Sequence, residues 1–250
     1  MSTPPAPSPP ATDRSGPALD DLLGIADDAL LAAQWLGGWI AEAPVLEEDV
    51  ALANIALDQL GVARALLAHV GELEGAGRGE DDLAYWRGPE EFRNALLVER
   101  PDKRDFAVLV VRLLLLSTAQ LHRYAALRSS PDPVVAAVAT RAVTEVSYHR
   151  DHARGWLLRL GDGTPESHDR VQAALDAEWP YLAEVLEPTT DEEVRAVLTR
   201  DIADATLRVP ADPPNPTPYA GGRTGWHTPH LTAVLEELQQ VARAHPGASW

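Results

Sequence analysis

The sequence predicts an all-α protein, and three observations support that fold class. From Leu19 onward, apolar residues recur three and four positions apart, which is the spacing of one helix face. Glycine and proline stand at the ends of these segments, where helices usually stop. No convincing stretch alternates apolar and polar residues as a half-buried strand would. We therefore expect residues 18–250 to form a single helical domain.

The first two expected helices form a hairpin. One runs from Leu19 to Ala43 and stops before Pro44. The other runs from Leu46 to Glu74 and ends in a glycine-rich stretch, residues 75–79, which suits a helix C-terminus.

A crossover and a second hairpin follow. Short helical pieces are expected at Asp81 to Trp86 and Pro89 to Glu99, then long helices at Asp105 to Arg128 and Pro133 to Leu160. Two long hairpins joined by a longer crossover have the connectivity of a ferritin-like bundle. The expected fold is a ferritin-like four-helix bundle with additional C-terminal helices.

The additional helices begin at recognisable caps. Thr164 followed by Pro165 resembles an N-cap and first helical residue, and this helix continues to Val185. A capping box from Thr190 to Glu193 opens a helix that reaches Leu207. After an irregular loop at Pro210 to Gly222, the last helix runs from Pro229 to Ala244.

Composition restricts the partners. The 250 residues include 38 acidic and 21 basic side chains, so the net charge of -17 opposes binding to nucleic acid or to an anionic membrane. The most apolar run, Phe106 to Leu116, contains Arg112 and is shorter than a membrane span.

Cysteine is absent and no secretory signal is recognisable, which favours the cytoplasm. Residues 1–17 are rich in proline, and we expect a disordered tail.

The second and third long helices are apolar on nearly every side. The second carries Val50, Leu52, Ile55, Leu57, Leu60, Val62, Leu66 and Leu67. The third carries an almost unbroken apolar run from Val108 to Leu116. A helix of this kind lies centrally or is covered by another chain, so we expect a stable oligomer, with self-association as one form.

The fourth long helix carries an incomplete ligand pattern for a di-iron centre. In di-iron bundles, two helices each supply Glu-x-x-His and two others each supply a glutamate. Here Glu145 is followed by Tyr148 at the third position, and the imidazoles come later, at His149 and His152. In the second helix, Asp58 is the equivalent acid, but Gly61 stands three residues on and cannot bind a metal.

The other two helices supply no clear ligand either. Residues 108–118 contain no acid and offer Arg112, Ser117 and Thr118. In the first helix, Asp27 and Asp28 are best interpreted as solvated acids, and Gln34 as a polar residue at the rim.

We therefore expect no catalytic residue, no cofactor and no metal in this chain, with Asp58, Glu145, His149 and His152 as vestigial ligand positions. Asn54 and Asp58 lie four apart in an apolar helix, so their burial would require hydrogen-bond partners. We expect a buried polar network in place of the metal, formed by Asn54, Asp58, Arg64, Arg112 and Glu145. In it, Arg112 or another arginine neutralises Glu145.

Two alternatives remain open from these residues. In one, the chain is an enzyme with a degenerate iron site held by Asp58, Glu145 and His149. In the other, it is a helical bundle that binds an acyl-CoA by itself, which the acidic charge disfavours.

Five sequence blocks in order resemble the C-subunit family (PaaC type) of the bacterial phenylacetyl-CoA epoxidase, a multicomponent ring oxygenase. They are residues 47–64, 92–99, 145–149, 156–164 and 221–231, and the similarity covers nearly all of the chain after its tail. The resemblance implies a bundle that has lost its di-iron centre. It further implies a homologous catalytic partner that holds the di-iron and binds phenylacetyl-CoA, with a separate reductase supplying electrons. The expected function is thus a non-catalytic structural subunit in aerobic phenylacetate catabolism.

Overall fold

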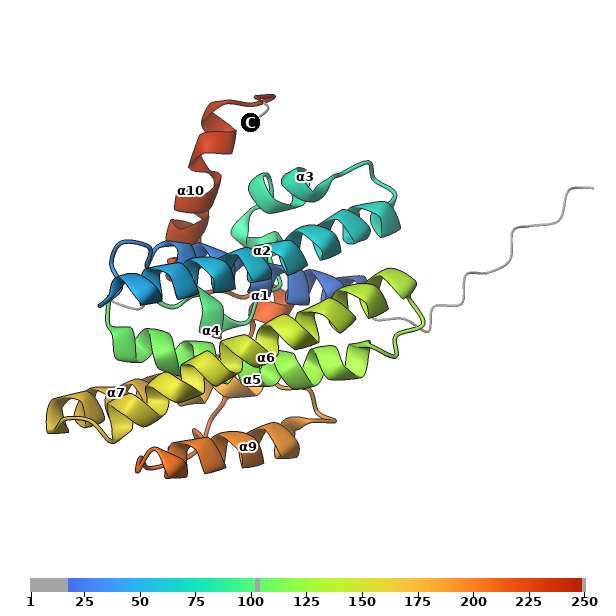
Figure 1. Ribbon diagram of the computed structural model, residues 1–250. Coiled ribbons are helices and arrows are strands. Elements are labelled where there is room, and N and C mark those ends of the chain that lie inside the picture. Colours follow the sequence, from blue (N-terminus) through green and yellow to red (C-terminus); the bar gives the residue numbers. More distant parts are fainter. Residues whose placement is uncertain (1–17, 102–103, 249–250) are drawn as a thin grey trace, which may run out of the picture.

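The computed structural model describes residues 18–101 and 104–248, and within these ranges it contains helices and loops but no strand. The tail predicted at residues 1–17 lies outside the described residues. Four long helices form the bundle: α1 (Leu19–Gly37), α2 (Leu46–Glu74), α5 (Phe106–Leu127) and α6 (Pro133–Gly161). The most extensive packing is within the pairs α1 with α2 and α5 with α6. Figure 1 shows α2 and α6 side by side on the face toward the reader. The ferritin-like all-α class is confirmed.

The first helix ends at Gly37 rather than at Ala43 as expected. Residues 38–43 form turns instead, and the carboxylate of Asp49 accepts hydrogen bonds from the backbone N–H groups of Ala41 and Ala43, at 3.0 and 3.2 Å. Ala41 has a left-handed backbone with a φ of 69°. The side chain at the start of α2 thus supplies the acceptor that a continuing helix would have supplied.

The crossover also differs from the expected pieces. It consists of α3 (Glu80–Tyr85), the short 3₁₀ helix η1 (Pro89–Glu91) and α4 (Leu96–Glu99). The expected helix over Pro89 to Glu99 is interrupted at residues 92–95. There, the backbone N–H groups of Arg93 and Ala95 bind the carboxylates of Asp27 and Asp28 in α1, which replaces their helical hydrogen bonds.

The C-terminal helices pack on two parts of the bundle: α7 and α9 contact α5 and α6, and α10 contacts the crossover. They are α7 (Pro165–Glu178), η2 (Trp179–Tyr181), α8 (Leu182–Val185), α9 (Asp191–Asp204), η3 (Thr217–Tyr219), η4 (Gly222–Thr224) and α10 (Pro229–Ala244). Pro180 follows Glu178 closely and divides the expected helix at residues 165–185 into three parts. Thr164 caps α7 as predicted, whereas Thr190 makes no side-chain cap to α9.

The two strongly apolar helices have different environments. Every residue of α5 from Leu109 to Gln120 is buried, so this helix lies centrally. Helix α2 keeps an apolar outer face, with Leu46, Val50 and Leu57 exposed. Both helices are long and apolar enough to cross a membrane by length and composition alone, a test that a buried core helix also passes. The predicted absence of a membrane partner stays a prediction.

Candidate functional site

Three polar residues of α6, namely Glu145, His149 and His152, lie along the seam between α6 and α2 and have partners in α2 or within α6. His149 Nε2 lies 3.0 Å from Asp58 Oδ2, and His152 Nε2 lies 2.9 Å from Glu48 Oε2. Arg141 Nε donates to Glu145 Oε1 at 2.8 Å. Tyr148 points to the surface. The four vestigial positions are therefore divided among three pairs: Asp58 with His149, His152 with Glu48, and Glu145 with Arg141.

A pair of amides occupies the interior between α2, α5 and α6. The side chains of Gln59 and Gln120 are buried and exchange two hydrogen bonds, of 2.9 and 3.0 Å. Gln59 Nε2 also lies 3.4 Å from His149 Nδ1. Sequence reasoning missed both glutamines. Their signal was an uncharged polar residue within each of two strongly apolar helices, which requires a partner when buried.

Arg141 occupies the space beside Gly61, where the second helix lacks a ligand. A β-carbon added at Gly61 would overlap the guanidinium of Arg141. This arginine also pairs with Glu145, so the cation next to that acid is Arg141. Glu145 Oε2 is buried and has no hydrogen-bond partner among the described residues.

Arg112, the arginine named for this role from sequence, lies elsewhere in the core. It binds Glu178 of α7 through Nε at 3.1 Å and donates to the carbonyl of Arg100 at 2.7 Å. The prediction named Arg112 or another arginine for Glu145: Arg112 is wrong, and the arginine that pairs with this acid is Arg141. Arg112 meets Glu178, a buried acid that α7 supplies, and this partner lies outside the four bundle helices from which the pairing was predicted.

The rest of the predicted buried network does not form among the described residues. Asn54 is exposed, because it lies on the outer side of α2. Arg64 is an exposed residue that pairs with Glu80 of α3, with 65% of its side chain accessible. Of the five predicted members, Asp58 contacts His149, and Arg112 and Glu145 have separate partners. Asn54 and Arg64 lie on the outer side of α2, whereas Asp58 faces α6. The sequence pattern did not distinguish these two sides of the helix.

These residues do not fit a di-iron centre. Such a centre needs about four carboxylates and two imidazoles that converge on the bundle axis. The side chains that meet there are two glutamines and one histidine. Within the described part of the chain, no three histidine or acidic side chains are grouped so that they could hold a metal ion. The expectation that this chain carries no metal stays a prediction.

The acids of α1 form a second polar cluster, and the expectation that they are solvated is wrong. Asp27 is completely buried and accepts hydrogen bonds from Arg87 and from the backbone N–H of Arg93. Burial raises the pKa of Asp27, against the opposing effect of the Arg87 guanidinium. Both partners come from the crossover, so their approach to α1 could not be inferred from helical spacing.

Asp28 connects the same cluster to the far end of the chain. Its carboxylate accepts from the backbone N–H of Ala95 at 2.7 Å and from Arg223 Nη2 at 2.5 Å. Arg223 also donates to the carbonyl oxygens of Gly24 and Arg93. The irregular segment at residues 221–230 is therefore fixed to α1.

His227 completes this attachment through the crossover. Its Nδ1 lies 2.8 Å from Glu99 Oε2, and its Nε2 lies 3.1 Å from the carbonyl oxygen of Phe92. Burial acts to lower the pKa of His227, but the hydrogen bonds to Glu99 and Phe92 outweigh it and raise the pKa above its usual value. Gly222 lies so close to the carbonyl of Asn94 that a β-carbon would not fit. We call Asp27, Asp28, Arg87, Glu99, Arg223 and His227 the α1 ion cluster.

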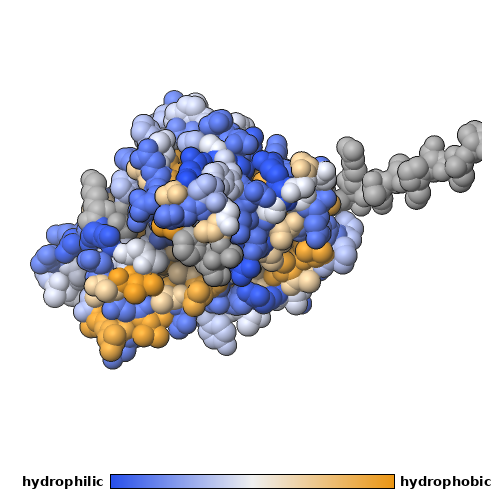
Figure 2. Space-filling view, turned by 90° about the horizontal axis from the view of Figure 1, so that it is seen from above, coloured by the Kyte–Doolittle hydropathy of each residue, from blue (hydrophilic) through white to orange (hydrophobic). Residues whose placement is uncertain are grey.

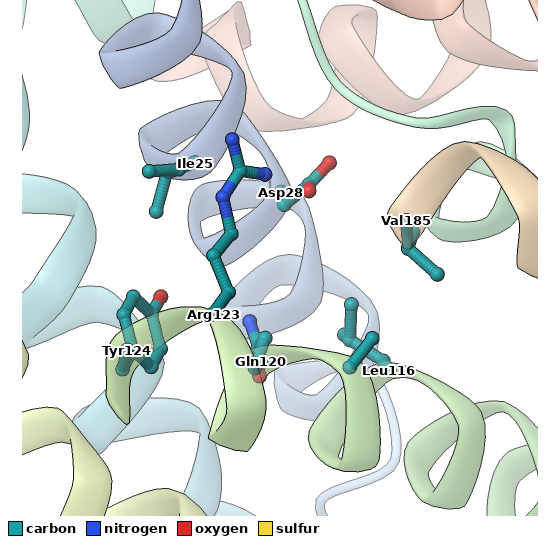
Figure 3. A pocket seen from close by; sticks show the side chains of 8 residues that line it. Ile25, Asp28, Leu116, Gln120, Arg123, Tyr124 and Val185 are labelled. Atoms are coloured by element: carbon teal, nitrogen blue, oxygen red, sulfur yellow. The ribbon is translucent and has the colours of Figure 1, made fainter. Parts of the chain in front are cut away.

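A small cavity adjoins this cluster. Figure 3 shows Arg123 extending from α5 toward Asp28, with Gln120 and Tyr124 on the same helix. The cavity has a volume of about 10 Å³, room for about one water molecule. The Tyr124 hydroxyl is buried and finds no partner among the described residues. Burial raises the pKa of Tyr124. This cavity is far too small for an acyl-CoA.

Comparison with known proteins identifies the family to which this bundle belongs. Residues 1–200 match the family model described as phenylacetic acid catabolic protein. The chain is 38% identical over 245 residues to the C subunit of the 1,2-phenylacetyl-CoA epoxidase of Escherichia coli (strain K12), covering 91% of this chain and 97% of that protein. The resemblance seen in the five sequence blocks is confirmed: the chain belongs to the phenylacetic acid catabolic protein family.

Proposed function

We propose that this chain is a non-catalytic structural subunit of a multicomponent phenylacetyl-CoA ring epoxidase in aerobic phenylacetate catabolism. Its partner is a homologous subunit that holds the di-iron centre and carries out the oxygenation. The similarity to the C subunit of the E. coli epoxidase, over nearly the whole of both chains, supports membership of such a complex. A cytoplasmic location is part of the same proposal.

The observation that carries the non-catalytic role is the Gln59–Gln120 amide pair at the bundle axis. Each amide satisfies the other, so the interior is a closed hydrogen-bonded contact between α2 and α5. Amide side chains are neutral and do not supply the negative charge that two bridged iron ions require.

The neighbouring positions support the same conclusion. His149 already hydrogen-bonds Asp58 through one ring nitrogen and faces Gln59 with the other. Arg141 adds a positive charge beside Gly61 and Glu145, which repels a cation. In this bundle the polar side chains at the former ligand positions form hydrogen bonds between helices. We propose no cofactor for this chain.

Co-expression with the homologous catalytic subunit from the same genome tests the proposal. We expect a stable complex on size-exclusion chromatography, with the iron content of the complex accounted for by the partner. The lone chain should contain no stoichiometric iron and show no oxygenase activity with phenylacetyl-CoA. Stoichiometric iron in the lone chain would instead support the degenerate iron site. A tight complex of the lone chain with a CoA ester would support the acyl-CoA-binding alternative.

A further inference from the structure

The outer side of α2 and α6 carries large apolar side chains with no covering element among the described residues. Leu46, Val50 and Leu57 of α2 are 73%, 57% and 64% exposed, and Tyr148 of α6 is 70% exposed. Apolar side chains gather at the lower left of Figure 2, on the side of the molecule where α2 begins, and hydrophilic side chains surround them. We call Leu46, Val50, Leu57 and Tyr148 the α2–α6 face.

These four side chains share one surface because the seam holds the two helices together beneath them. Leu57 precedes Asp58 and Tyr148 precedes His149, and the carboxylate and imidazole lie 3.0 Å apart. His152 and Glu48 fix the helices again, nearer the start of α2, at 2.9 Å. Leu46 and Val50 are four residues apart and therefore lie on the same side of α2. The two hydrogen-bonded pairs of the seam hold α2 and α6 together, so the apolar residues of the face remain available for a partner.

The charges around this face identify the chemistry of what it binds. Exposed acids stand next to the apolar residues: Glu42 and Glu47 near the start of α2, and Asp151 one turn after Tyr148. Asp58 is 38% exposed at the seam. Three arginines on the same two helices are paired with acids: Arg141 with Glu145, Arg150 with Asp151 and Asp201, and Arg64 with Glu80. The rim is therefore predominantly acidic, like the whole chain with its net charge of -17.

We propose that the α2–α6 face binds the homologous subunit of the epoxidase, and that the partner presents an apolar centre with a lysine- and arginine-rich rim. This inference rests on the proposed function and adds the surface and its charge. A second copy of this chain would place acidic rims against each other, which costs binding free energy. An anionic membrane would be repelled for the same reason.

The experiment measures binding of full-length variants to the co-purified catalytic subunit, with a matched control on the same helix. Leu57→Asp places a charge within the face. Leu73→Asp makes the same change at the other end of α2, where Leu73 is 52% exposed. We expect Leu57→Asp to raise the dissociation constant at least about tenfold, because an apolar contact buried in an interface carries much of the binding energy. For the control, the dissociation constant should stay within about twofold of the wild-type value, because Leu73 lies far from the face. Raising the salt concentration should weaken the wild-type complex, since the rims attract by charge.

The outcomes separate this inference from the proposed function. A wild-type chain that does not bind the partner contradicts the proposed function itself. A wild-type complex that tolerates Leu57→Asp overturns only the assigned face. Should Leu57→Asp lose its helical circular dichroism, Tyr148→Ser, a change at an exposed side chain, provides the same test.

Two further measurements test whether the α2–α6 face binds a second copy of this chain or an anionic membrane instead. Sedimentation of the lone chain would overturn the proposal by showing a dimer that Leu57→Asp dissociates. Flotation with vesicles of phosphatidylcholine and phosphatidylglycerol would overturn it by showing membrane binding that the same variant abolishes.

Discussion

The α2–α6 seam and the α1 ion cluster both pair a histidine with a carboxylate, but with opposite effects on the histidine. At the seam, burial lowers the pKa of His149, and the hydrogen bond to Asp58 offsets this only in part. In the cluster, hydrogen bonds to Glu99 and Phe92 outweigh burial and raise the pKa of His227. Glu99 is itself held by the backbone N–H of Thr228 and by Asn94. The direction of the pKa shift thus depends on whether the hydrogen bonds to the imidazole outweigh its burial, and an acid alone does not decide it.

The two regions also do different work in the fold. The seam joins the two hairpins of the bundle along an edge that solvent reaches, since Asp58 is partly exposed. The cluster joins α1, the crossover and residues 221–230, which are far apart in the sequence. Its carboxylates and Arg87 are buried, whereas 25% of the Arg223 side chain is exposed. We therefore expect that breaking the cluster lowers the free energy of unfolding more than breaking the seam does.

The largest expected effect comes from removing one charge of the cluster. Asp27→Ala leaves the Arg87 guanidinium buried without its partner, so the free energy of unfolding should fall by about 3–5 kcal/mol. The matched change at the seam, Asp58→Ala, should cost about 1 kcal/mol or less, because Asp58 is partly exposed and His149 can remain neutral. Urea denaturation followed by circular dichroism measures both. Equal losses would contradict the difference between the two regions.

The amide pair allows a smaller and reversible perturbation of the bundle axis. Gln59→Leu leaves the buried Gln120 without its partner and should destabilise the chain by about 1–3 kcal/mol. The double variant Gln59→Leu, Gln120→Leu should recover most of that loss, because both polar groups are then removed. A double-mutant cycle in urea denaturation checks this. Additive losses would show that the two amides do not depend on each other.

The smallest effects concern pH, and the two histidines have opposite signs. The folded pKa of His227 lies above its ordinary value of 6.5, so its contribution is complete below that value and is lost as the pH rises through the folded pKa. The folded pKa of His149 lies below 6.5, so stability falls as the pH drops from that value toward the folded pKa.

Variants that cannot titrate separate these contributions. His227→Gln should flatten the alkaline side of the stability profile, and His149→Gln the acidic side. Urea midpoints measured between pH 5 and pH 9, a range of about two units on either side of the usual histidine pKa, provide the check. If both variants kept the pH profile of the wild-type protein, neither histidine would have a pKa that differs between the folded and the unfolded chain.

Several site residues were predictable only as candidates. The sequence identified Glu145, His149 and Asp58 as positions near a lost centre, and the structure brings His149 and Asp58 together. It did not identify Gln59, Gln120 or Arg141, because a polar residue in an apolar helix does not reveal which helix supplies its partner. Asp27 and Asp28 were misjudged because charged side chains are usually solvated. They lie in the middle of α1 rather than in its first turn, and the crossover covers them.

The sequence by itself determined the helices, their pairing into two hairpins and the family, since periodicity, caps and local blocks are properties of neighbouring residues. Most long-helix boundaries agree with the structure, and the exceptions are where distant side chains intervene, as Asp49 does after α1. Only the tertiary structure decided which charges are buried, which arginine meets which acid, and which side of α2 stays exposed. Those outcomes depend on contacts between residues that are distant in sequence, and a pattern along one helix does not contain them.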